Sequence, residues 1–226
     1  MSVTIAHPDI VGRYLVGDRA QFLSVRRSEL DRTAFSYART LASFNIEPGR
    51  YVLTISLIQE VIQFAPFEQA LTLLGLIGTN ADASPFDAGR VESLVRQFDV
   101  AAICGLDAGV LDGLAALGHD PAKILAGRIV WARPSAYERV AALPDVIARR
   151  CAEIGPILAL QCASGEGMHF DGREWIVTDR GGSLGFTSHA ARIEPLSDLN
   201  TGVHGHLAQR PCACGSPDPR IVLNGV

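Results

Sequence analysis

"PCACGSPDPR", residues 211–220, places Cys212 and Cys214 one residue apart in a stretch built from turn-forming residues. Proline, glycine, serine and aspartate make up most of it, so packing into an apolar core does not easily explain its two thiols. Earlier in the chain, "CASGEGMH" (162–169) holds Cys162 and His169, with glycines between them that let the chain turn back. Together the two stretches offer three thiolates and an imidazole, a donor set suited to a closed structural zinc site.

The spacing of these residues differs from that of a zinc finger, so an alternative stands beside the metal. Cys162 would then pack in the core, and the Cys-Ala-Cys pair would have no ligand role. We favour a metal because cysteines in turns of proteins from reducing compartments usually have such a reason. Four protein ligands leave no open position, so we predict a structural zinc ion and not a catalytic one. His204 and His206 are rival ligands, which we expect to be exposed loop residues.

The composition is that of a globular protein from a reducing compartment. Of 226 residues 48% are hydrophobic, and the net charge is −4, so the chain can bury a core and has no bulk attraction to nucleic acid or membranes. Its five cysteines, an odd number, argue against a disulfide framework, and we expect Cys104 and Cys151 to be structural. The sequence shows no membrane-spanning run and no signal-peptide pattern, so we expect a cytoplasmic protein.

Strand-like and helix-like segments alternate along the first two thirds of the chain. Short apolar runs predict strands over 51–58, 99–105 and 127–132. Helical spacing, with Ser28 and Asp87 as N-caps, predicts helices over 28–44, 67–78, 86–98 and 107–118, and over 134–155 with an interruption at Pro144 and Cys151 near the end. Such alternation with short links is typical of a parallel sheet covered by helices.

The last third changes character. Short apolar or alternating runs separated by glycines predict antiparallel strands, over 155–162, 168–180, 182–189 and 191–196. We therefore predict an α/β fold in which a parallel sheet flanked by helices (residues 1–155) precedes a β-rich, zinc-stapled C-terminal segment (residues 156–226).

Several of these segments resemble the phenylacetate-CoA ligases, within the superfamily of adenylate-forming enzymes. "YARTLASFNIEPGRYVLTIS" (37–56) is similar to the family's helix, Gly-x-x-Pro-Gly-Asp turn and strand. "EIGPILALQCASGEGMHFDGREWIV" (153–177) resembles the stretch that follows its Tyr-Gly-x-x-Glu motif, and "CACGSPDPRI" (212–221) its Cys-x-Cys-Gly-Arg-x-x-Pro ending. Several family members hold a structural zinc ion with such residues, so the resemblance implies four metal ligands, Cys162, His169, Cys212 and Cys214.

The chain departs from the family pattern where the family binds nucleotide. The Gly/Ser/Thr-rich phosphate loop expected before the first helix is replaced by "VGDRAQFLSVRRS" (16–28). The family's magnesium-binding glutamate aligns with Ala152, one position from Glu153. Its ribose-binding aspartate aligns with Val203, and one of its arginines aligns with Asp198. The sequence also stops near the hinge where the family's small C-terminal domain begins, so we expect that domain, with its adenylation lysine, to be lacking.

These departures favour a degenerate, truncated ligase-like protein, a pseudoenzyme. Because each oriented group contributes several kcal/mol to the transition state, losing several together should abolish adenylation. We therefore expect a binding or accessory protein, with a full-length ligase or a carrier protein as its partner; self-association into a homo-oligomer is left open. The alternative is a repurposed enzyme acting without ATP on an acyl or aryl small molecule, a carboxylate or a thioester. The polar groups offered for that alternative are His189, His204, His206, Glu153 and Asp198.

Overall fold

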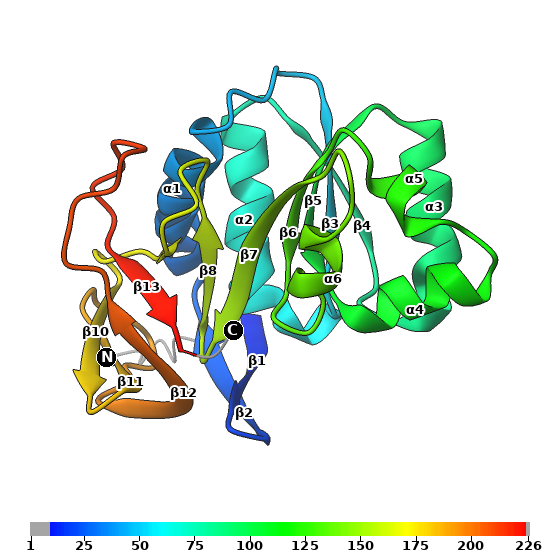
Figure 1. Cartoon of the computed structure of the whole chain (residues 1–226). Coiled ribbons are helices and arrows are strands. Elements are labelled where there is room, and N and C mark those ends of the chain that lie inside the picture. Colours follow the sequence, from blue (N-terminus) through cyan, green and yellow to red (C-terminus); the bar gives the residue numbers. More distant parts are fainter. Residues whose placement is uncertain (1–9, 225–226) are drawn as a thin grey trace, which may run out of the picture.

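The computed structural model describes residues 10–224, in which one long sheet carries helices on both faces of its parallel part (Figure 1). The strands are β1 (Ile10–Val16), β2 (Arg19–Val25), β3 (Tyr51–Ile55), β4 (Ile77–Ala81), β5 (Val100–Leu106), β6 (Ile129–Ala132), β7 (Ile147–Ile154), β8 (Ile157–Gln161), β9 (Met168–His169), β10 (Trp175–Arg180), β11 (Ser183–Ser188), β12 (Leu199–Leu207) and β13 (Arg220–Leu223). The helices are α1 (Arg27–Ala42), α2 (Val61–Leu73), α3 (Ala88–Gln97), α4 (Ala108–Ala116), α5 (Pro121–Leu125) and α6 (Tyr137–Ala141), with short 3-10 turns η1 (Ile58–Glu60) and η2 (Pro85–Asp87).

The sheet has a parallel half and an antiparallel half. Strands β4, β3, β5, β6 and β7 lie side by side in that order and are parallel. From β8 onward the pairing is antiparallel, in the order β8, β9, β13, β12, β11 and β10. The predicted fold class, a parallel sheet with helices followed by a β-rich segment, is therefore confirmed.

Alternation along the central strands builds two apolar layers. On β6, Ile129 and Trp131 face the layer formed with α1 and α2, whereas Val130 and Ala132 face the layer formed with α3 to α6. Figure 1 shows the two sets of helices on opposite faces of the sheet. The Trp131 ring is fully buried, and its Nε1 donates to the Gln161 carbonyl at 2.7 Å, so this large side chain has no unsatisfied polar atom.

One predicted helix is wrong. Residues 134–155 were expected to be helical, but only α6 forms there, and β7 follows it as a strand that carries Cys151. The Ala, Arg and Glu residues of β7 favour a helix when they are considered locally. Parallel pairing with β6 on one side and antiparallel pairing with β8 on the other override that preference. Cys151 is buried on this strand, so its structural role was expected correctly from the wrong element.

Other boundaries also differ from the prediction. The helix expected over 67–78 ends at Leu73, and β4 follows as an edge strand with little apolar alternation to reveal it. Helix α1 begins at Arg27, so Ser28 is not its N-cap; the Arg26 N–H instead donates to the Glu29 carboxylate at 3.3 Å. No strand forms over 191–196.

A hairpin near the start of the described chain packs against the β-rich part. Strands β1 and β2 are joined by Gly17 and Asp18, and the Gly17 N–H donates to the Thr201 carbonyl of β12 at 3.1 Å. The predicted division at residue 155 falls in the turn between β7 and β8, where the pairing changes direction, and it stays a prediction. Within residues 10–224 no helix combines the length and hydropathy that a membrane span requires.

Candidate metal centre

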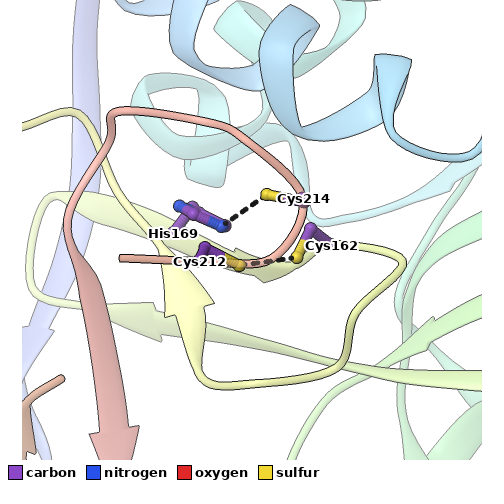
Figure 2. Close-up of side chains that lie close together, drawn as sticks. All are labelled: Cys162, His169, Cys212 and Cys214. Carbon is purple, nitrogen blue, oxygen red and sulfur yellow. Dashed lines mark hydrogen bonds between the residues drawn. The ribbon is translucent and has the colours of Figure 1, made fainter. Parts of the chain in front are cut away.

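The predicted metal ligands come from three segments of the β-rich part. Cys162 follows β8, His169 lies on β9, and the loop between β12 and β13 carries the other two cysteines. The ligand atoms all lie within 4.8 Å of one another, and Figure 2 shows the side chains gathered around one centre. The structure thus brings together the whole predicted set: Cys162, His169, Cys212 and Cys214.

Two turns of the same four-residue type each contribute a cysteine to this centre. Residues 162–165 read Cys-Ala-Ser-Gly, and residues 212–215 read Cys-Ala-Cys-Gly. In each turn the glycine N–H donates to the carbonyl of the first cysteine at 3.1 Å, and the glycine φ is positive, +73° and +79°. Residues with a side chain are strained in that conformation, so each turn needs its glycine. Sequence reasoning missed this repeat, although the Cys-Ala-x-Gly pattern is visible in the chain.

Ser164 occupies in the first turn the place that Cys214 occupies in the second. Its Oγ lies 2.9 Å from the Cys162 Sγ and 3.0 Å from the Cys212 Sγ, and these two sulfurs are 3.5 Å apart. A hydroxyl at such distances can donate to a thiolate and favour its negative charge. Ser164 is therefore a neighbour of the centre that sequence reasoning did not single out.

The orientation of His169 suits a metal ligand. Its Nδ1 lies 2.8 Å from the backbone carbonyl of Asp218, an acceptor, so Nδ1 carries the proton. The lone pair is then on Nε2, which lies 3.4 Å from the Cys214 Sγ, inside the cluster. Holding the distal imidazole nitrogen on a carbonyl is the usual way in which proteins orient a metal-binding histidine.

The loop that carries the cysteine pair is also fixed to helix α1. The Asp218 carboxylate accepts two hydrogen bonds from the Arg39 guanidinium, both at 2.7 Å, and one from the Ser36 hydroxyl at 3.1 Å. Asp218 is buried, and bidentate pairs of this kind are among the stronger hydrogen bonds in proteins. Asp218 thus joins the centre, through its carbonyl, to the helical layer, through its side chain.

The electrostatics of the cluster favour a cation. Burial raises the pKa of the Cys162 thiol, but hydrogen bonds with His169, Ser164 and the other cysteines outweigh burial and lower it to about 5. Burial and the adjacent sulfurs raise the pKa of Cys214 to about 12. Burial also raises the pKa of Cys212, but hydrogen bonds with Ser164, Cys214 and His169 outweigh burial and lower it, so negative charge is favoured at Cys162 and Cys212 and opposed at Cys214. A divalent ion would remove that opposition, because the thiolate is the form that binds metal.

The cluster passes a geometric test for a tetrahedral site. Zinc–sulfur bonds of about 2.3 Å place neighbouring tetrahedral sulfurs about 3.8 Å apart. The Cys162–Cys212 and Cys214–His169 contacts, 3.5 Å and 3.4 Å, are close to that spacing before any ion is considered. Three sulfurs and one nitrogen within 4.8 Å can therefore hold a metal ion with little rearrangement.

The rival histidines lie outside the cluster. His204 and His206 are exposed on β12, and the His206 Nδ1 is 3.4 Å from the Asn224 side chain. Over residues 10–224, Cys162, His169, Cys212 and Cys214 form the one group of three or more potential ligands that could hold a metal. The expectation that both histidines are exposed is confirmed; they belong to a strand and not to a loop.

The polar residues offered for a repurposed active site do not gather in one place. His189 is exposed, with Nδ1 3.3 Å from the Gly172 carbonyl, and Asp198 is ion-paired with Arg180. Glu153 lies elsewhere, at the end of β7, against Arg133. These residues form no common catalytic group.

A second polar cluster lies at the carboxyl ends of the parallel strands. In the order β4, β3, β5, β6 and β7, the chain steps outward from β3 to β4 and then returns to the other side with β5. Open α/β sheets bind ligands at the carboxyl edge where the strand order reverses in this way. Here that edge lies between β3 and β5.

The Arg133 guanidinium fills this edge. Its Nε donates to the Gly105 carbonyl on β5 at 3.0 Å, and its Nη2 donates to the Ile55 carbonyl on β3 at 3.3 Å. The charge is balanced by Glu60 at 2.8 Å and Glu153 at 2.5 Å. Burial raises the pKa of Glu153, and although Arg133 opposes this, Glu60 adds to it, so the value rises to about 7. The strand ends are therefore capped by the protein's own side chains.

The positions that the resemblance assigns to nucleotide binding make other contacts. The segment expected to replace the phosphate loop, residues 16–28, forms the Gly17–Asp18 connection of the β1–β2 hairpin, strand β2 and the start of α1. Ala152 and Val203 pack in the apolar cluster that contains Trp175. Each position is thus occupied by a hairpin or by core packing.

Comparisons with known proteins agree on the fold. No protein-family model matches the sequence, and no curated protein matches it either. 2-Hydroxyisobutyryl-CoA ligase in complex with 2-HIB-AMP and CoA matches with a TM-score of 0.71 at 15% identity, over 95% of this chain and 52% of that one. A malonyl-CoA ligase bound to methylmalonyl-CoA and AMP matches with a TM-score of 0.58 at 16% identity, over 97% and 53%. The N-terminal subdomain of Klebsiella oxytoca NpsA, with anthranilyl-AMSN, matches at 0.56 and 12%, over 95% and 63%.

The chain spans about half the length of the first of these solved structures. At identities of 12–16% these matches establish the fold alone. The expected fold, that of the adenylate-forming CoA ligases, is confirmed; the narrower resemblance to phenylacetate-CoA ligases stays a prediction.

Proposed function

We propose that this chain is a zinc-stapled protein of ligase fold that does not adenylate carboxylic acids and serves as a binding or accessory protein. The observation that carries the proposal is the Arg133 guanidinium, which sits with Glu60 and Glu153 where such sheets take their ligands. A nucleotide or acyl group would have to displace a half-buried cation whose guanidinium is fully paired, and would leave Glu153 without its partner. That displacement is costly because unpaired buried charges are strongly unfavourable.

The nucleotide-binding positions support the same proposal. A phosphate loop binds through many backbone N–H groups on a wide turn, and the Gly17–Asp18 connection of β1–β2 is too short to form one. At the position of the magnesium-binding carboxylate, Ala152 offers no oxygen ligand, and the neighbouring Glu153 is held by Arg133. Each loss removes a group that stabilises the same transition state.

Zinc is the ion that we propose for the metal centre. Thiolates and an imidazole in a closed set of four favour zinc over magnesium or calcium, which prefer oxygen ligands. The ligands leave no open coordination position, so the ion would stabilise the fold and take no part in a reaction. Its ligands are Cys162, His169, Cys212 and Cys214.

The outer face of hairpin β1–β2 supports a protein partner. Val11, Leu15 and Phe22 lie on this face, with 55%, 45% and 64% of their surface exposed. Contiguous exposed apolar side chains on a hairpin are more typical of an interaction surface than of a free one. We propose that a protein partner covers this face.

A pyrophosphate-release assay tests the catalytic half of the proposal. The metal-loaded protein is incubated with ATP, magnesium and a panel of aryl and fatty acids, and release should stay at the background of the acid-free reaction. Metal content measured on the same sample shows that the protein is folded. Acid-dependent pyrophosphate release by the pure chain would refute the proposal.

Co-purification of the untagged protein tests the accessory role. The Phe22→Ser variant should lose the partner, because Phe22 lies on the exposed hairpin face. Leu117→Ser is the matched control, since Leu117 is also exposed, at 56%, but follows α4. Equal partner recovery by both variants would exclude the hairpin face as the contact.

A second candidate function is a repurposed enzyme acting on an acyl or aryl small molecule without ATP. Its site would be a cavity of about 330 Å³ at the carboxyl ends of β3 and β4, beside the edge that Arg133 fills, where Glu68 and Asp82 favour an acyl thioester over a carboxylate. Thermal-shift screening with aromatic acids and acyl-CoAs tests it. Reproducible stabilisation by one of these classes would favour this function over the accessory one.

A further inference from the structure

The cavity beside the Arg133 cluster has three walls. The first is the face of α2 that carries Val61, Ala65 and Glu68 at helical spacing. The second is the chain that leaves β3, and the third is the end of β4. A volume of about 330 Å³ is at the small end of the range for ligand sites in proteins. The lining residues are Ser56, Leu57, Ile58, Val61, Phe64, Ala65, Glu68, Asn80 and Asp82.

The lining divides into an apolar part and an acidic part. Leu57, Val61 and Phe64 belong to the apolar part, and Ile58, 93% exposed, is an apolar residue at the cavity with almost its whole side chain in solvent. The acidic part consists of Glu68 on α2 and Asp82 after β4. The cavity therefore suits a ligand with an apolar body and a polar end.

The two carboxylates have no cation of their own. Across residues 10–224, no ion pair involves Glu68 or Asp82. The Arg90 guanidinium is bonded to the carbonyl and side chain of Asn80, another residue of the cavity lining, at 2.9 Å and 3.4 Å. Burial raises the pKa of Glu68, which means that its charged form is penalised and would gain from a cationic partner.

An anionic ligand is disfavoured at the same place. A carboxylate or a phosphate in the cavity would meet Glu68 and Asp82 as like charges. This argues against acyl and aryl carboxylates as occupants of this cavity.

A divalent metal ion is also disfavoured. Among the residues that the structure describes, Glu68 and Asp82 belong to no group of three or more ligands able to hold a metal. Calcium takes six or more oxygen ligands, and the apolar wall offers none. A cation bound here must therefore bring an apolar surface with it.

We propose that this cavity binds an organic cation, a primary amine on a short alkyl or aryl body. The ammonium group would lie between the carboxylates of Glu68 and Asp82, and the apolar body would lie against Leu57, Val61 and Phe64. The inference rests on the cavity and its charges, and it stands whether or not the chain adenylates carboxylic acids.

A set of three matched compounds tests the proposal. Phenethylamine, 2-phenylethanol and phenylacetate share a phenyl body and differ in charge, and their binding to the metal-loaded protein is measured by ligand-observed NMR and calorimetry. Phenethylamine should bind saturably below about 10 mM, a range in which weak small-molecule binding is still measurable. The alcohol should bind more weakly, and the carboxylate should not bind.

Charge-removing variants locate the site. Glu68→Gln and Asp82→Asn should each weaken phenethylamine binding about tenfold, the effect of losing one charge-assisted hydrogen bond. Glu47→Gln is the control, because Glu47 is an exposed carboxylate that does not line the cavity. Unchanged metal content and melting temperature in each variant show that the fold is kept.

Three outcomes would overturn the proposal. They are no saturable binding of phenethylamine by the wild-type protein, binding that both charge-removing variants retain, and binding of phenylacetate as tight as that of phenethylamine. None of these outcomes bears on pyrophosphate release, so the failure of this inference is distinguishable from the failure of the proposed function.

Discussion

Two polar regions of this chain, the metal centre and the Arg133 cluster, use buried charge in opposite ways. At the metal centre, three segments aim thiols and an imidazole at a shared point, and the groups present there favour a cation that the chain does not supply. At the carboxyl ends of the parallel strands, Arg133 is that cation, and Glu60 and Glu153 neutralise it. The first region could hold a metal ion, whereas in the second the charges are balanced by the protein's own side chains.

The two regions therefore differ in role. The metal centre holds loops of the β-rich part in place, and the Arg133 cluster lies at the sheet edge where open α/β sheets bind their ligands. The Cys-Ala-x-Gly turns and the Asp218 bridge to α1 stabilise loops far apart in the chain. The edge between β3 and β5 is where a ligand would bind, and there the chain has placed its own guanidinium.

Removing one thiol should have the largest effect. Cys212→Ser leaves three ligands, and we expect loss of the metal together with a stability loss of about 5 kcal/mol, roughly 10 to 20 °C in Tm. Elemental analysis and calorimetry on untagged protein measure both. Cys104→Ser is the control, because Cys104 is buried on β5 and outside the cluster, so it should keep the metal. Unchanged metal content in Cys212→Ser would contradict the assignment of Cys212 as a metal ligand.

Removing the internal cation should come next. Arg133→Ala leaves Glu153 without its partner and Glu60 with only Arg13, at 3.9 Å, and breaking a largely buried pair in this way costs about 3 to 5 kcal/mol. Metal content should stay at the wild-type level, since the two regions share no ligand. Adding Glu60→Gln and Glu153→Gln to Arg133→Met should restore much of the loss, because no unpaired charge then remains. If Arg133→Ala were as stable as wild type, the ion pairs of Arg133 with Glu60 and Glu153 would not contribute to stability.

The pH dependence of stability tests the charge state of Glu153 in the Arg133 cluster. The pKa of Glu153 in the folded protein, about 7, lies above the ordinary value of 4.5, so between these values the native state holds a proton that the unfolded state has lost. The stabilisation from this residue is complete below pH 4.5 and is lost as the pH rises through 7, an effect of about 3 kcal/mol.

Denaturant unfolding from pH 5 to pH 8 measures this effect against Glu153→Gln. The free energy of unfolding of the variant should rise relative to that of wild type as the pH rises. Because both proteins have the same metal ligands, the difference between their unfolding free energies reports on Glu153 alone. A constant difference between the two proteins over this range would rule out a raised pKa for Glu153.

Loosening the anchor of the metal loop should have the smallest effect. Asp218→Asn keeps the backbone carbonyl that orients His169 but weakens the bidentate contact with Arg39, a loss of about 1.5 kcal/mol. Zinc should remain bound, with an affinity about tenfold lower, because outer partners of metal ligands act on this scale. Competition with a chromophoric chelator measures the affinity. Complete loss of metal would mean that Asp218 is more than an anchor.

The grouping of the four candidate ligands could be predicted because cysteine and histidine are recognisable in a sequence as metal-binding residue types. Cysteines in glycine-rich turns, with a histidine nearby, have few other roles in a reducing compartment. The prediction missed Ser164 and the repeated turn, since a serine at that position has no signature of its own.

The Arg133 cluster at the carboxyl ends of β3 and β5 could not be predicted from the sequence. Arg133 acts through the carbonyls of Ile55 and Gly105 and the carboxylates of Glu60 and Glu153, groups that only the folded sheet brings together. The errors in secondary structure have the same origin. Strand β7 was mistaken for a helix because its strand state depends on pairing with β6 and β8. Long-range pairing decides such segments, and local propensity does not record it.

Native mass spectrometry of the untagged, metal-replete protein, with and without magnesium and ATP, tests both halves of the comparison at once. The account predicts the mass of one chain plus one zinc ion, with charge states typical of a folded protein and no change when nucleotide is added. A folded chain with no bound metal, or a saturable nucleotide adduct on the zinc-bound chain, would contradict it.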